Sequence, residues 1–191
     1  KTYDDVTIDN TTGNAYTVWM KTASTMPSAV IFPFKYNNKP VTRLSQSGQT
    51  SGFDYRANLT NVYIPETIHF IGDYVFNKCT NLKELNIPSS VRQIIGTQTF
   101  GASGITKIIA PGCQTFGNNK NYEYGVCYDA KSLEYVILGS KEYPFKEIKS
   151  VANTVGYRQF YSCPKLKFVN LVTENGLRSD VIFPASEANN T

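Results

Sequence analysis

The chain has 191 residues, of which 41% are apolar and 18% are charged, so its size and composition predict one folded domain with a sizeable core. Its net charge is +4, from 19 Lys and Arg against 15 Asp and Glu. The charges are scattered rather than clustered, which argues against nucleic acid as a partner. No run of about 18 apolar residues occurs, so we expect no membrane insertion.

The N-terminal segment has the pattern of a β-hairpin. In residues 3–20, YDDVTIDNTTGNAYTVWM, apolar residues alternate on both sides of the turn formers at 9–14. We expect residues 1–26 to form an N-terminal β-hairpin cap, because a stack of repeats exposes core and sheet edge at its open end.

The middle of the chain repeats itself. LTNVYIPETIHFIGDYVFNKC (59–79) is followed by LKELNIPSSVRQIIGTQTF (82–100), and copies start at Leu59, Leu82 and Ile105, at intervals of 23 residues. Looser copies start at Leu133 and Leu166, and a stretched first copy lies upstream. A period of this length predicts a solenoid, since one copy cannot bury its apolar face alone and must share a core with its neighbours.

Each copy opens with a segment that alternates inward and outward, as in LTNVYI and LKELNI. We expect these segments to stack as short parallel β-strands on the concave face, each ended by proline, with irregular or short helical return segments. Gly72, Gly96 and Gly156 are interpreted as tight bends on the return path. One phenylalanine in each copy is expected to fill the core.

The copies become irregular towards the C-terminus. The third copy loses its second half, and the fourth carries an insertion around GSKEYPFKEIKS. We expect a solenoid of about five copies over residues 27–171 and a C-terminal cap or truncated end over 172–191. SDVIFPAS, near the C-terminus, is expected to add a strand or a closing hairpin.

The outward positions of the strands are the first candidate binding site. They are the second and fourth residues after each start: Asn61, Tyr63, Glu84, Asn86, Lys107, Ile109, Tyr135, Ile137, Phe168 and Asn170. Half are apolar or aromatic, and contiguous exposed apolar surface often marks a partner site. The ordinary preference of β-strands for such residues explains them equally well.

The segment 112–131, GCQTFGNNKNYEYGVCYDAK, is the second candidate site. It stands where the third copy departs from the repeat, and it carries Tyr122, Tyr124 and Tyr128. Insertions on one face of a solenoid are often functional, although the segment is also explained as a cover for the core.

Catalytic and metal-binding patterns are weak, so we predict no catalytic residues, no metal site, no cofactor and no enzyme activity. The single histidine, His69, lies between core positions and should point to solvent. Cys79 and Cys163 occupy matching core slots several coils apart and should be unreactive free thiols. Whether Cys113 and Cys127 form a disulfide stays open.

The chain resembles the BspA-type leucine-rich repeat family of bacterial and protozoan cell-surface proteins. The resemblance rests on the coincidence of these positions in three segments, LTNVYIPETIHFIGDYVFNKCTN, LKELNIPSSVRQIIGTQTF and FYSCPKLKFVNL. The resemblance implies a leucine-rich repeat solenoid that is secreted or displayed at the cell surface, with a role in adhesion and host–microbe contact. A monomer that binds a matrix or cell-surface protein is expected, with a glycan as the other partner class. The alternative is a structural spacer that displays another domain. The chain starts at Lys1 without an export signal, as expected of a piece of a longer protein.

Overall fold

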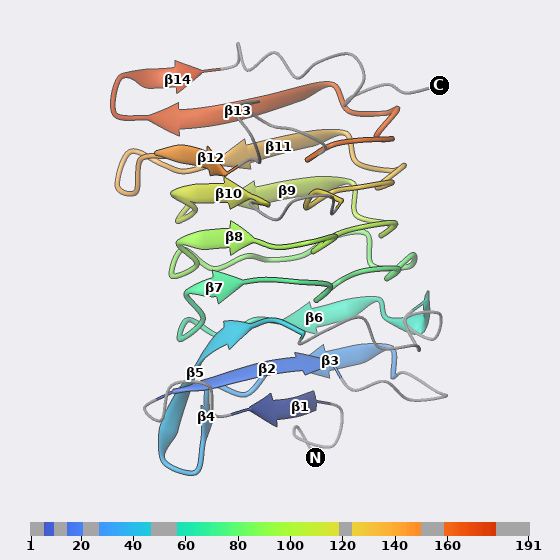
Figure 1. The fold of residues 1–191 in the computed structure, drawn as a ribbon, viewed down its shortest axis with the longest axis vertical. Coiled ribbons are helices and arrows are strands. Elements are labelled where there is room, and N and C mark those ends of the chain that lie inside the picture. The colour runs from blue at the N-terminus through green and yellow to red at the C-terminus, as the bar shows by residue number, and fades with distance from the viewer. Residues whose placement is uncertain are drawn as a thin grey trace.

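The computed structural model describes residues 6–9, 15–20, 27–46, 57–118, 124–149 and 159–178, which form a ladder of stacked coils from β1 at one end to β14 at the other (Figure 1). The strands in chain order are β1 (Val6–Asp9), β2 (Tyr16–Met20), β3 (Ala29–Ile31), β4 (Lys35–Tyr36), β5 (Lys39–Leu44), β6 (Asn61–Tyr63), β7 (Phe70–Ile71), β8 (Gln93–Ile95), β9 (Lys107–Ala110), β10 (Thr115–Gly117), β11 (Tyr135–Leu138), β12 (Glu147–Lys149), β13 (Phe168–Thr173) and β14 (Gly176–Arg178). The described residues contain no α-helix, and none of their segments is a helix able to cross a membrane.

Parallel pairing joins the repeat strands. β3 pairs with β6, and β9, β11 and β13 pair in one continuous register, so that Lys107, Tyr135 and Phe168 are cross-strand neighbours. The predicted leucine-rich repeat solenoid is therefore confirmed.

The return path differs from the expected irregular or helical segments. It contributes a second sheet, in which β5, β7, β8, β10 and β12 pair in parallel, one strand from each successive coil. These strands have two to six residues, and their main-chain hydrogen bonds run between coils rather than within a helix.

A phenylalanine ladder runs through the core between the two sheets. Phe76 and Phe100 stack with ring centroids 5.5 Å apart, and Phe32 meets Phe76 edge to face at 6.5 Å. Further along, Phe116 stacks on Phe160 at 5.6 Å, and all of these rings are buried. Aromatic pairs of this kind contribute roughly 0.5–1.5 kcal/mol beyond the apolar area that they bury.

The third copy does not lose its second half, contrary to the prediction. β10 continues the second sheet, and the turn at 126–129 stacks on its neighbours, since the Phe100 amide donates to the Val126 carbonyl at 2.8 Å and the Cys127 amide donates to Gln159 at 2.8 Å. Phe116 enters the core from β10, where it pairs in register with Ile94, but it follows Ile94 by 22 residues instead of 23, which is why the sequence period concealed it.

The ends of the ladder carry antiparallel pairs. β1 and β2 form the expected hairpin, and β2 then pairs in parallel with β5. β13 and β14 form a second hairpin. The expected strand at 179–186 lies outside the described residues.

Gly72 and Gly96 allow neighbouring coils to approach closely. Neither has a positive φ, so the left-handed backbone conformation is not what requires glycine at these two positions, and the interpretation as tight bends stays a prediction. A Cβ on Gly96 would lie 2.4 Å from the main-chain carbon of Gly72, which real Cβ atoms do not tolerate. Gly156 lies outside the described residues.

The repeat-strand sheet is interrupted at residues 82–87. β6 is the edge of a two-stranded sheet and β9 is the edge of a four-stranded sheet, so the expected continuous sheet is wrong at this coil. The Thr106 amide donates to the Lys83 carbonyl at 3.0 Å, but within the described ranges the main chain of residues 84–87 makes no hydrogen bond. The outward residues here are Glu84 and Asn86, both poor strand formers, which weakens pairing.

The interruption predicts a local difference in hydrogen exchange. We expect the amides of Glu84, Leu85 and Asn86 to exchange at least about 100-fold faster than those of Val136 and Ile137, which lie within the ladder of β11. NMR-detected hydrogen–deuterium exchange of the folded chain measures both groups in one sample. Equal protection would show that the sheet is continuous after all.

Candidate functional site

The predicted outward residues all reach the surface along one face. We call this the repeat-strand face: the outward side chains of β3, β6, residues 82–87, β9, β11 and β13. The exposed members are Asn61, Tyr63, Glu84, Asn86, Ile109 and Phe168, and the half-buried members are Lys107, Tyr135, Ile137 and Asn170. Most inward residues between them are buried, so the predicted alternation of inward and outward side chains along the strands is confirmed.

An apolar and aromatic cluster occupies one half of this face. The rings of Tyr135 and Phe168 stack with centroids 5.2 Å apart and planes 16° from parallel. Ile137 lies two residues after Tyr135 on β11, and its cross-strand partner Ile109 lies on β9, so these two side chains form the next row of the cluster. Phe168 is 40% exposed and Ile109 is 41% exposed, which is unusual for such large apolar side chains.

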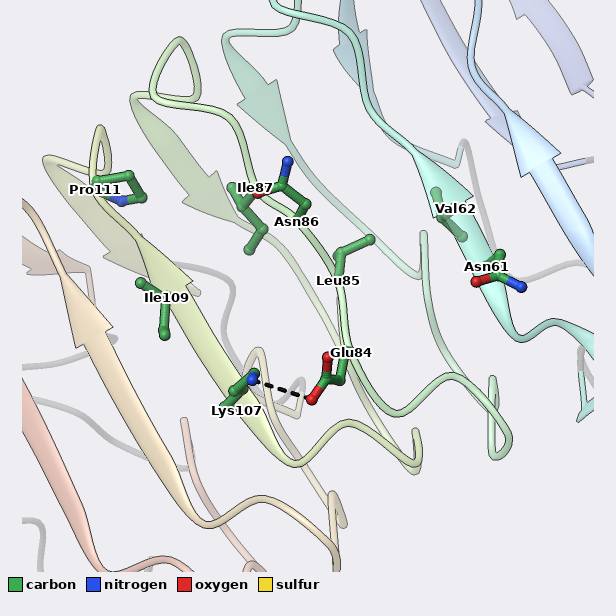
Figure 2. A pocket seen from close by; sticks show the side chains of 9 residues that line it. All are labelled: Asn61, Val62, Glu84, Leu85, Asn86, Ile87, Lys107, Ile109 and Pro111. Carbon is green, nitrogen blue, oxygen red and sulfur yellow. Dashed lines mark ion pairs between the residues drawn. The ribbon is translucent and has the colours of Figure 1, made fainter.

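A hollow of about 470 Å³ lies at the interrupted rung, beside this cluster. Figure 2 shows the side chains that line it from β6, the unpaired segment and β9: Asn61, Val62, Glu84, Leu85, Asn86, Ile87, Lys107, Ile109 and Pro111. The Lys107 ammonium lies 3.0 Å from the Glu84 carboxylate, and this hydrogen bond is the main cause that raises the pKa of Lys107. Because the Glu84 side chain is 70% exposed and the Lys107 side chain is 36% exposed, water screens the pair and it contributes little to stability.

The tyrosines of the 112–131 segment lie apart from this face. Tyr124 stacks on Tyr128 with centroids 3.8 Å apart, and Tyr128 stacks on Tyr161 of the next coil at 5.3 Å. They lie on the turns that precede the repeat strands, and no contact of the described residues joins them to the outward positions above. Tyr122 lies outside the described residues.

Several residues of the surface were missed by sequence reasoning. Ile31 is 53% exposed and pairs in register with Tyr63, and the Val-Ile-Phe-Pro match at 30–33 contained the signal that would have found it. Val62 and Leu85 were assigned to the core but are half-buried, because the coils that should cover them do not pair.

All four cysteines are buried free thiols. Burial is the main cause that raises the pKa of Cys113 and of Cys163 from 9.0 to about 12, and it also raises the pKa of Cys127. Cys113 and Cys127 are therefore not joined by a disulfide, and the predicted burial of Cys79 and Cys163 is confirmed.

Potential metal ligands do not cluster in the described part of the chain. No group of three His, Cys, Asp or Glu side chains that could hold a metal occurs there. His69 is exposed, as expected, and its Nδ1 lies 3.1 Å from the Ser90 carbonyl oxygen. The described surface provides apolar area and hydrogen-bonding groups on a fixed backbone.

Comparison with known proteins agrees with this architecture. Residues 47–183 match the family model of the BspA type leucine rich repeat region, in six copies. Because the match covers well over half of the chain, the protein belongs to the BspA-type leucine-rich repeat family. Among curated proteins, no sequence matches.

The chain is similar to solved structures of leucine-rich repeat proteins, and the T. pallidum protein among them shares its fold. The T. pallidum leucine rich repeat protein is 16% identical, with a TM-score of 0.52 over 87% of this chain and 90% of its own. A leucine-rich repeat protein from Bacteroides ovatus is 19% identical, with a TM-score of 0.47 over 87% of this chain and 45% of its own. A leucine rich cell surface protein from Faecalibacterium prausnitzii is 16% identical, with a TM-score of 0.46 over 94% of this chain and 57% of its own.

The raised thiol pKa values predict slow thiol chemistry in the folded chain. With a pKa of about 12, a cysteine such as Cys113 is ionised to only about one part in 10,000 at pH 8, and its burial also excludes the reagent. We expect Ellman's reagent to react slowly with the native protein at pH 8, and fast with all four thiols in guanidinium chloride. Rapid reaction of any native thiol would contradict the buried assignment.

The same shifts give the sign of the pH dependence. Folding favours the protonated thiols, so their contribution to the free energy of unfolding is complete below about pH 9 and declines as the pH rises from 9 towards 12.

Proposed function

We propose that the chain is an extracellular or cell-surface binding module that recognises a protein partner through its repeat-strand face, in the manner of an adhesin. The observation that carries this proposal is the cluster of Tyr135, Phe168, Ile109 and Ile137 on three paired strands. Stacked aromatic side chains on a rigid sheet provide contact area at a small entropic cost, as binding hot spots do.

The architecture supports recognition rather than catalysis. A stacked scaffold holds a broad surface at fixed geometry, and ion pairs of the described residues, such as Lys167 with Glu134, lie at that surface. Placement at the cell surface is the ordinary setting for this family, and an extracellular matrix protein is the partner class that follows. A neutral glycan is the second partner class.

Removal of the aromatic pair tests this proposal. We expect Tyr135→Ala combined with Phe168→Ala to raise the Kd for a matrix protein at least about tenfold, because two adjacent hot-spot rings are lost. The partner is the strongest binder from a panel of immobilised matrix proteins, measured by surface plasmon resonance. Far-UV circular dichroism and thermal unfolding check that the variant folds.

Phe34→Ala is the matched control, since this aromatic ring is 62% exposed and lies outside the cluster. We expect it to leave the Kd unchanged. An unchanged Kd in the double variant would remove the cluster as the binding site. If no protein of the panel binds the native chain, the spacer function is favoured instead.

A further inference from the structure

The interrupted rung leaves a row of main-chain groups without partners inside the repeat-strand face. Residues 84–87 run between β6 and β9, and no main-chain hydrogen bond of the described residues ties them to either strand. Unpaired N–H and C=O groups in an extended segment are a template on which another extended chain can pair. The row spans roughly 13 Å at about 3.3 Å a residue, which suits four or five residues of a partner.

The side chains around this row have the chemistry of peptide recognition. The Asn86 amide is exposed and makes no hydrogen bond to the described residues, and an amide presents one donating and one accepting end, as a peptide unit does. Val62 and Leu85 are half-buried at the hollow, where they offer apolar contact to alternate side chains of a bound strand (Figure 2).

The net charge of the hollow favours uncharged partners over charged ones. Glu84 and Lys107 are its only charged lining residues, and they neutralise each other across 3.0 Å. A lining with no net charge and many dipoles complements the neutral, dipolar main chain of a polypeptide. It offers no excess of positive charge to an acidic polysaccharide or to a strongly acidic peptide.

We infer that the hollow between β6 and β9 binds an extended, uncharged segment of a partner polypeptide through that segment's main chain. This inference rests on the proposed function and deepens it, since it assigns one protein-recognition subsite of the repeat-strand face. The hollow forms hydrogen bonds with the main chain of the bound segment, while the neighbouring Tyr135–Phe168 cluster provides apolar contact area to the same partner.

A peptide library supplies the probe. Random linear dodecapeptides displayed on phage are selected on the immobilised chain, and the best binder is synthesised with blocked ends. A second version carries backbone esters in place of the central amides, so that it keeps its side chains but loses N–H donors. We expect the ester version to bind at least about tenfold more weakly by fluorescence anisotropy, because several main-chain hydrogen bonds to the peptide are lost.

Two variants of the chain locate the peptide. Asn86→Leu removes the amide inside the hollow, and Asn81→Leu removes an exposed amide of the preceding turn, which lies outside both the hollow and the repeat-strand face. Asn86 is exposed, so its replacement leaves the core untouched, and circular dichroism checks folding. We expect a Kd raised about tenfold for Asn86→Leu and an unchanged Kd for Asn81→Leu.

The outcomes separate this inference from the proposed function. Equal binding of the ester peptide, or equal Kd values for the two asparagine variants, overturns the hollow as a main-chain site. Peptides whose binding depends on Tyr135 and Phe168 but not on Asn86 also overturn it, and leave the proposed function standing. The inference is likewise overturned if the library yields no binder while matrix proteins bind, or if a neutral oligosaccharide array binds in place of peptides.

Discussion

The whole structure depends on the sharing of one core between coils that are too small to have their own. A coil such as 82–104 contributes a few large apolar side chains, among them Leu82 and Phe100, and each of these is buried only because the neighbouring coils cover it. Burial of such a side chain stabilises the fold by roughly 1.5–3 kcal/mol, which is far less than the entropy lost when a whole coil is ordered. The stack is therefore the folding unit, and no single repeat is.

The same constraint determines which residues are free to act. Inward positions are occupied by the shared core, so chemical variety is confined to outward positions of the strands and to the turns between them. Where two coils fail to pair, as at residues 84–87, the scaffold gains a hollow, and the main-chain groups of this segment have no hydrogen-bond partner among the described residues. The aromatic cluster on β11 and β13 and this hollow are neighbouring parts of one surface, joined by Lys107 and Ile109 on β9.

Much of this arrangement could be predicted from periodicity, because inward residues such as Leu59, Leu82 and Ile105 recur at fixed intervals and must all reach the same core. The return sheet could not, since strands as short as Phe70–Ile71 carry no readable alternation. Phe116 was hidden because it falls one residue short of the 23-residue period, although it pairs in register with Ile94. The gap at 84–87 depends on pairing between coils, and the low strand propensity of Glu84 and Asn86 was its only signal in the sequence.

The shared core is tested most directly by measuring how far along the stack one core substitution lowers stability. Phe100→Ala removes a buried ring of the ladder, and the account predicts that it lowers the opening free energies of amides in β7, β8 and β11 together, by about 3–5 kcal/mol, as measured by native-state hydrogen exchange. A loss confined to β8, within the deleted ring's own coil, would contradict the account, because it would show that each coil is stabilised on its own.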